Sequence, residues 1–244
     1  MAGIDAYDRS ARLAPAYLVF SPAVVFVVVL ALGTSEWWSK LGGILVACGA
    51  PLFAVEWGRS GGRQKQTKLI EMWGGPPTTQ LLRFRTGGSA AIVRHRHEVV
   101  ERATGLKLPT ATGEKQDPAA ADDEYEIAVA DLRERTRDEK EFPLVVKENT
   151  AYGFRRNLWG RKEYGTAVAI LALTASAVLL IAAAVGHGFG SWAAAAVATG
   201  FAALALVVWQ TTITPGWVRE AAEAYATRLL ESAVRLPAAE APRA

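Results

Sequence analysis

The sequence predicts an all-α integral membrane protein in which four transmembrane helices form two hairpins that flank a mainly helical cytosolic domain. Three observations support this fold class. Apolar residues make up 51% of the 244 residues and gather in four blocks without Lys, Arg or Asp. Each block has about the length that an α-helix needs to cross the ~30 Å hydrocarbon layer. Nearly all of the 27 Lys and Arg residues lie in segments that fall on one side of these spans.

The predicted spans are Pro15–Gly33, Leu41–Trp57, Thr166–Val185 and Trp192–Thr212. A buried helix of a soluble protein would keep a polar face, and the run of valines in the first span has none. The first span has an alternative interpretation as a cleaved signal peptide, because it ends in small residues. The acidic residues before it and the second span that follows within seven residues favour a retained helix.

The positive charges predict the orientation. The two short connections between paired spans hold a single cation, Lys40, and the other Lys and Arg residues lie in the N-terminal segment, the middle region and the C-terminal tail. Cytoplasmic segments of membrane proteins are enriched in Lys and Arg. We therefore expect a multi-pass protein of the bacterial inner (plasma) membrane with both termini in the cytoplasm. The predicted division is residues 1–14 as a cytosolic segment, 15–57 as the first hairpin, 58–165 as the cytosolic domain, 166–212 as the second hairpin and 213–244 as a cytosolic amphipathic helix with its tail.

Capping signals predict the helices of the cytosolic domain. Ser89 is a good N-cap for a helix that Gly105 would end, and Asp117-Pro118 begins another helix with the apolar stripe Tyr125, Val129 and Leu132. Thr78 or Thr79 would cap a short turn. Residues 108–115 are predicted as a loop, and residues 142–146 as a short extended stretch because they are β-branched and contain a proline.

The C-terminal residues 217–236 are predicted as an amphipathic helix, because apolar residues recur at alternating spacings of four and three. Its apolar stripe has three alternative destinations: the cytosolic domain, the membrane surface or a second copy of itself. Packing on the domain is the simplest, since the heptad run is short.

The corner at residues 73–79 is the first candidate site. Its two glycines expose backbone N–H groups and two arginines follow, so a small anion has suitable donors here. The alternative is a rigid corner between two helices. The P-loop pattern is absent. The candidate ligand-binding residues are Gly74, Gly75, Thr78, Thr79, Arg83 and Arg85.

The segment that enters the third span is the second candidate site. It alternates aromatic and cationic residues, which suits the headgroup zone of a membrane with anionic lipid. The alternative is a plain positive-inside anchor, which explains most of these residues but explains Asn157 least well. The candidate headgroup or juxtamembrane residues are Tyr152, Arg155, Arg156, Asn157, Trp159, Arg161 and Lys162.

Cofactors, metals and catalytic residues are not expected. The single cysteine, Cys48, excludes an internal disulfide and cysteine-rich metal centres. His95 and His97 are two residues apart and would point to opposite sides of a helix, so His97 is expected to pair with Glu101 on the surface. Neither G-x-S-x-G nor H-E-x-x-H occurs, and we expect no enzyme. The domain's acidic second half would repel nucleic acid.

The spans themselves predict helix packing more than transport. Small residues four apart favour close helix contacts, namely Gly43 with Ala47 and Ala196 with Gly200. No ionisable residue lies at mid-depth, which disfavours a channel or transporter. We expect an oligomeric signalling or effector protein whose cytosolic domain senses a ligand or partner, similar in architecture alone to membrane effectors of bacterial defence. The alternative is an accessory or scaffold subunit of a larger membrane complex.

Overall fold

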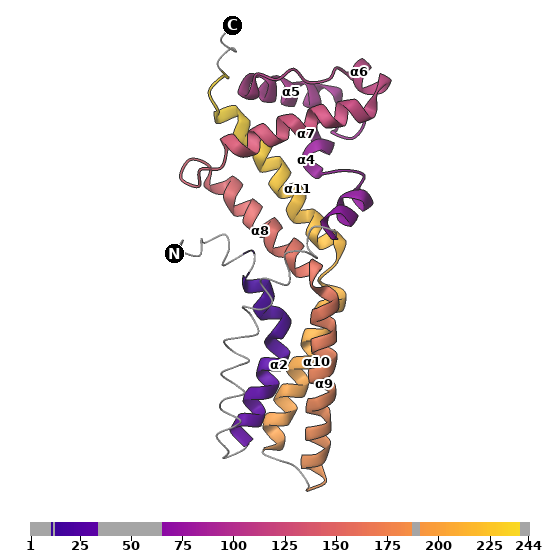
Figure 1. The fold of residues 1–244 in the computed structure, drawn as a ribbon, viewed down its shortest axis with the longest axis vertical. Coiled ribbons are helices and arrows are strands. Elements are labelled where there is room, and N and C mark those ends of the chain that lie inside the picture. The colour runs from indigo at the N-terminus through magenta and orange to yellow at the C-terminus, as the bar shows by residue number, and fades with distance from the viewer. Residues whose placement is uncertain (1–10, 12, 34–64, 187–190, 240–244) are drawn as a thin grey trace. The chain divides into compact units, whose positions relative to one another are not determined.

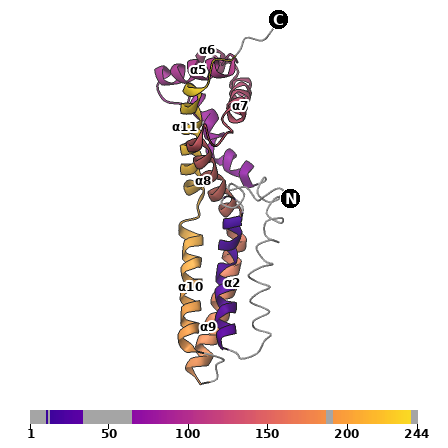
Figure 2. The same cartoon turned by 90° about the vertical axis from the view of Figure 1, so that its left-hand side faces the viewer.

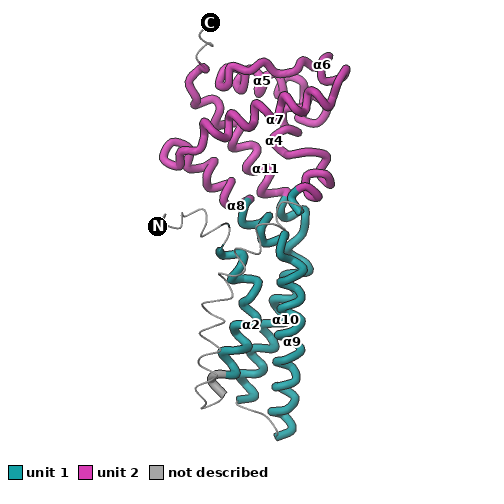
Figure 3. The backbone as a smooth tube through the Cα atoms, viewed as in Figure 1, with its two compact units in different colours: residues 1–66, 153–218 teal, residues 67–152, 219–244 magenta. Residues whose placement is uncertain are grey.

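The computed structural model describes residues 11, 13–33, 65–186 and 191–239. Within these ranges the regular structure is helical and no strand occurs, which confirms the all-α prediction (Figure 1). The chain divides into two compact units (Figure 3). We call residues 1–66 and 153–218 the apolar unit, and residues 67–152 and 219–244 the charged unit.

The apolar unit contains three described long helices that lie side by side: α2 (Ala14–Gly33), α9 (Lys162–Ala184) and α10 (Trp192–Thr211) (Figures 1 and 2). Both α9 and α10 are long and apolar enough to cross a membrane, and a short connection joins them. Their position agrees with the predicted second hairpin. The predicted span at residues 41–57 lies outside the described residues.

Small side chains make up most of the buried surface of α9 and α10, which pack on each other and on α2. Gly165 faces the indole ring of Trp209, and a Cβ added there would overlap that ring. The buried residues of the two helices are otherwise alanine and serine: Ala169, Ala172 and Ser176 on α9, and Ala195, Ala198 and Ala202 on α10. Small residues let two helix backbones approach closely. The stability of this hairpin therefore depends on side chains that must stay small.

The small pair that the sequence suggested for α10 is not buried against the described residues, and its role in helix packing stays a prediction. Ala196 is half-buried and Gly200 is exposed, with open space where a Cβ would lie. The other suggested pair, Gly43 and Ala47, lies outside the described residues. The buried residues of α10 are Ala195, Ala198, Ala202 and Trp209, and neither member of the suggested pair is among them.

Two predicted helices of the charged unit are confirmed together with their caps. Helix α5 spans Ala90–Thr104, and Gly105 ends it with a left-handed φ of 74°. Helix α7 spans Pro118–Arg135, and the Asp117 carboxylate accepts hydrogen bonds from two backbone N–H groups of its first turn, at 3.0 and 3.2 Å. The predicted stripe of α7 is buried. Local capping signals thus determined both helices.

Three local predictions in this unit are wrong. Helix α4 (Pro77–Leu82) begins after Pro76 without a side-chain cap, and the threonines expected to cap it are buried. The predicted loop contains helix α6 (Ala111–Gln116), capped by Thr110 Oγ1. The predicted extended stretch is the first turn of α8 (Pro143–Gly160). A proline is well suited to the first turn of a helix, which is why Pro143 begins α8 and does not interrupt it.

The C-terminal helix α11 (Pro215–Ser232) and the short η2 (Ala233–Arg235) complete the core of the charged unit. Of the three alternatives, the structure has the helix pack on its own domain. Leu229, Leu230 and Ala233 pack in one cluster with residues more than 80 positions earlier. The buried members from the earlier segment are Leu82, Val100, Ala103, Leu108, Ala121, Tyr125, Ala128, Val129, Leu132, Phe142 and Val145.

Candidate functional site

The predicted anion site is a corner whose arginines already have carboxylate partners. Arg83 forms a two-point ion pair with Asp122, with Nε–Oδ1 and Nη2–Oδ2 distances of 2.7 Å. Its Nη1 donates to the Gly74 carbonyl at 2.6 Å. Arg85 donates to Asp122 and to Glu114 Oε1. Such paired, planar contacts are among the stronger hydrogen bonds in proteins.

The backbone donors of the corner are engaged as well. Gly74 N donates to Glu71 O at 3.1 Å and Gly75 N to Ile70 O at 2.9 Å, which completes the end of the helix at residues 65–73. Both glycines have positive φ, 75° and 120°. A Cβ at Gly75 would lie 2.5 Å from Arg83 Nη2. A small anion here would compete with carboxylates of the same chain, and its binding stays a prediction.

Glu114 is the central acceptor of this network, although no local sequence pattern indicates it. Its side chain accepts hydrogen bonds from Phe84 N at 2.7 Å, Arg85 N at 3.1 Å, Arg85 Nη1 at 3.0 Å and Tyr125 Oη at 2.9 Å. Glu114 is only 3% exposed. A buried carboxylate with this many donors acts as a clamp, which here holds the segment after α4 against α6 and α7.

The same contacts determine the protonation of the clamp. Burial alone would raise the pKa of Glu114, but the hydrogen bonds from Phe84, Arg85 and Tyr125 outweigh it and hold the pKa below its ordinary value. For Tyr125, burial and the Glu114 carboxylate together raise the pKa of the phenol. At neutral pH the clamp is therefore a carboxylate that accepts from a neutral phenol.

The lowered pKa of Glu114 predicts acid sensitivity of this segment. A carboxylate whose pKa is lower in the folded than in the unfolded protein stabilises the folded state. This stabilisation is complete above the pKa of the unfolded protein, about 4.3 for glutamate, and it is lost as the pH falls through the pKa of the folded protein. The amides of Phe84 and Arg85 should therefore lose hydrogen-exchange protection below about pH 4, after correction for intrinsic exchange rates. Glu114→Gln should remove this component. If Glu114→Gln lost protection with the same pH dependence as the native chain, Glu114 would not be the group responsible.

His97 is buried, so the expected surface pair with Glu101 is wrong. Its Nε2 donates to Leu82 O at 2.7 Å, and its ring lies between Phe84 and Tyr125, with centroid distances of 5.0 and 5.5 Å. Glu101 instead accepts from Leu108 N at 2.8 Å. The imidazole thus packs as a core group beside the clamp. The described residues contain no group of three metal-ligating side chains.

Most of the predicted juxtamembrane residues hold helix ends of the apolar unit together. Arg155 lies over the Trp217 ring at 4.8 Å and donates to its carbonyl at 2.8 Å. Asn157, which the anchor interpretation explained least, donates to Ala11 O at 2.7 Å. Arg156 donates to Gln66 and Arg161 to the Asn157 carbonyl. These side chains therefore have structural partners besides any lipid.

Lys162 and Trp159 complete this set. Lys162 Nζ donates to Ile213 O at 3.0 Å and Gln210 O at 3.4 Å, which places a cation at the carbonyl end of α10. Trp159 packs on the apolar cluster around Trp209. Tyr152, in the charged unit, stacks on Tyr225 at 6.3 Å. Contact with lipid headgroups stays a prediction for all of them.

The chain was compared with models of known protein families, with curated proteins and with solved structures, and none of the three comparisons finds a match.

Proposed function

We propose that the chain is an oligomeric multi-pass membrane protein of the signalling or effector type. In this proposal the apolar unit contributes four membrane spans in two hairpins. The charged unit and both termini lie in the cytoplasm. The charged unit senses a ligand or partner, and the apolar unit carries the response in the membrane.

Helices α9 and α10 support the membrane assignment. Both helices are apolar along most of their length, and only 17% of the apolar stretch of α9 and 22% of that of α10 is buried. A core helix of a soluble protein would be mostly buried, because water disfavours exposed apolar surface. Leu171, Val197 and Leu204 are each more than 60% exposed. Lipid chains are the solvent that suits such surfaces.

The order of the two units along the chain is the observation that supports a signalling role. The core of the charged unit is built from residues 67–152 and 219–244, and residues 153–218, which include α9 and α10, are inserted between these two segments. Helices α8 and α11 each contribute residues to both units. Any rearrangement of the charged unit therefore acts on both chain connections to the α9–α10 hairpin.

The oligomeric state tests this proposal. The full chain, extracted with native lipid into nanodiscs, should show one defined mass that is a multiple of the 26.1 kDa protomer. A strict monomer at every concentration would contradict the proposal. Recovery from native membranes of one stoichiometric partner of different sequence would instead favour the accessory-subunit alternative.

A further inference from the structure

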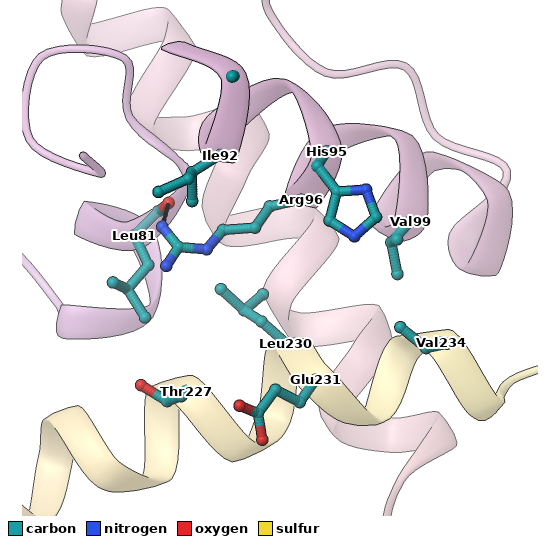
Figure 4. Close-up of a pocket in the computed structure, with 10 residues that line it drawn as sticks. Leu81, Ile92, His95, Arg96, Val99, Thr227, Leu230, Glu231 and Val234 are labelled. Atoms are coloured by element: carbon teal, nitrogen blue, oxygen red, sulfur yellow. Dashed lines mark hydrogen bonds between the residues drawn. The ribbon is translucent and has the colours of Figure 1, made fainter. Parts of the chain in front are cut away.

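The pocket between α5 and α11 lies within the charged unit and has a volume of about 480 Å³ (Figure 4). Two charged groups of its lining already have partners: Arg96 donates to two backbone carbonyls, and Glu231 pairs with Arg228. Leu81 and Leu230 of the lining pack in the core of the unit. Neither the charges nor the apolar lining of this pocket identifies a ligand.

One turn of α8, by contrast, contacts three segments of the apolar unit that are far apart in the sequence. We call three neighbours on this turn the junction residues: Arg155, Arg156 and Asn157. In that order, their side chains donate to Trp217 O at 2.8 Å, Gln66 Oε1 at 2.9 Å and Ala11 O at 2.7 Å. Consecutive residues of a helix point about 100° apart, so three neighbours reach three directions.

The contacted segments lead to different membrane spans of the proposed topology. Ala11 lies just before α2, and Trp217 follows α10 in the chain. Gln66 follows the predicted second span. Helix α8 itself leads into α9, which begins at Lys162. One helical turn therefore contacts, or continues into, a chain connection of each of the four proposed spans.

The contacts of the junction residues are restraints on these segments. All three side chains are half-buried, and Ala11 is fully buried. Arg155 makes a second contact, because its guanidinium lies over the Trp217 ring at 4.8 Å from the ring centre. Hydrogen bonds from a charged donor and cation–ring contacts are stronger than neutral surface pairs. A shift of this turn therefore acts on the segments that it holds.

The other end of α8 lies in the core of the charged unit. Val145, in the first turn of α8, packs in one cluster with Tyr125 and Leu132. Tyr125 is also the residue whose hydroxyl donates to the Glu114 clamp. A helix of 18 residues is about 27 Å long, and a helix transmits displacement as a rigid element. Helix α8 therefore connects the surroundings of the clamp to the junction residues.

We propose that α8 is a link through which the state of the charged unit reaches all four spans, with the junction residues as its points of attachment. Loosening of the core around Val145 lets the helix shift, and each junction residue passes that shift to a different segment. The junction residues are positioning residues, because they act through the segments that they hold. This inference rests on the proposed signalling function and specifies how the response is transmitted.

A double-mutant cycle tests this coupling in the full chain reconstituted in nanodiscs. Glu114→Gln perturbs the clamp, and Asn157→Ala removes the donor to Ala11. The measurement is amide hydrogen exchange of residues 14–20, the first turns of α2. In the native background Glu114→Gln should speed this exchange by roughly twofold or more, and in the Asn157→Ala background it should have almost no effect. Independent sites would give the same factor in both backgrounds.

Three further variants separate coupling from simple stabilisation of the contact. Asn157→Gln keeps an amide donor and should retain part of the coupling. Asn149→Ala, on the same helix but outside the junction residues, is the matched control and should retain all of it. Glu134→Gln alters an exposed pair with Arg137 and should leave the exchange of α2 unchanged in every background.

Two results would overturn the inference. An effect of Glu114→Gln on α2 that is equal with and without Asn157→Ala would show that the junction contact only stabilises its segment. The absence of any effect in the native background would show that α8 does not transmit the change. The proposed function is tested separately by the oligomer mass, so a failed cycle with a defined oligomer would remove this inference alone.

Discussion

Replacing Gly165 by alanine is expected to disrupt the packing of α9 on α10, because the added methyl group would overlap the buried ring of Trp209. Overpacking of this kind costs about 1–3 kcal/mol, and the rigid indole cannot yield as a flexible chain would. Alanine has the higher helix propensity by about 1 kcal/mol, so the intrinsic effect has the opposite sign. A clear loss of stability would therefore report the contact itself.

The thermal unfolding midpoint of the full chain in detergent measures this effect. Gly200→Ala provides the matched control, since Gly200 also lies inside an apolar helix but has no atom near an added Cβ. That variant should unfold at the native temperature or slightly above it. Equal midpoints for the native chain and Gly165→Ala would show that the α9–α10 contact differs from the one described here.

Replacing Glu114 by alanine is expected to cause the largest loss in the charged unit. The substitution leaves the Tyr125 hydroxyl and the backbone amides of Phe84 and Arg85 without this acceptor, while the Arg85 guanidinium keeps its ion pair with Asp122. Removal of one partner from a buried charged network costs about 3–5 kcal/mol. Hydrogen exchange at residues 84 and 85 should increase most, because both amides donate to this carboxylate.

Two further variants separate the causes. Glu114→Gln keeps an acceptor oxygen but removes the charge, so this variant should lose less stability than Glu114→Ala. Glu134→Ala removes an exposed ion pair with Arg137, of a kind that is worth less than about 1 kcal/mol. If Glu114→Ala and Glu134→Ala were equally stable, the buried clamp would contribute nothing that a surface pair does not.

The sequence predicts the parts of this fold that local rules determine. Ser89, Gly105 and Asp117-Pro118 define helix ends because capping depends on residues within one turn. The stripe of α7 follows from its own periodicity. Helices α9 and α10 follow from the length and hydropathy of two continuous blocks. None of these features needs knowledge of a distant partner.

The candidate site depends on distant partners, which is why the sequence predicts little of it. Glu114 reaches Phe84 and Arg85 across about 30 positions, and Asp122 reaches Arg83 across a similar distance. No local pattern indicates which carboxylate meets which arginine. His97 looked like one of several polar residues on a helix surface, and only the tertiary fold buries it. The corner after residue 73 is predictable, because the run Gly74-Gly75-Pro76-Pro77 cannot continue a helix whatever lies around it.

We propose that the α9–α10 hairpin crosses the membrane and that the charged unit lies in the cytoplasm. Single-cysteine labelling of intact cells tests it, in a Cys48→Ser background that removes the native thiol. Ser191→Cys, between the two helices, should react with an impermeant maleimide from outside. Lys115→Cys, in the charged unit, should react only after the membrane is permeabilised. Labelling of Lys115→Cys from outside, or recovery of the chain as a soluble protein without detergent, would contradict the claim.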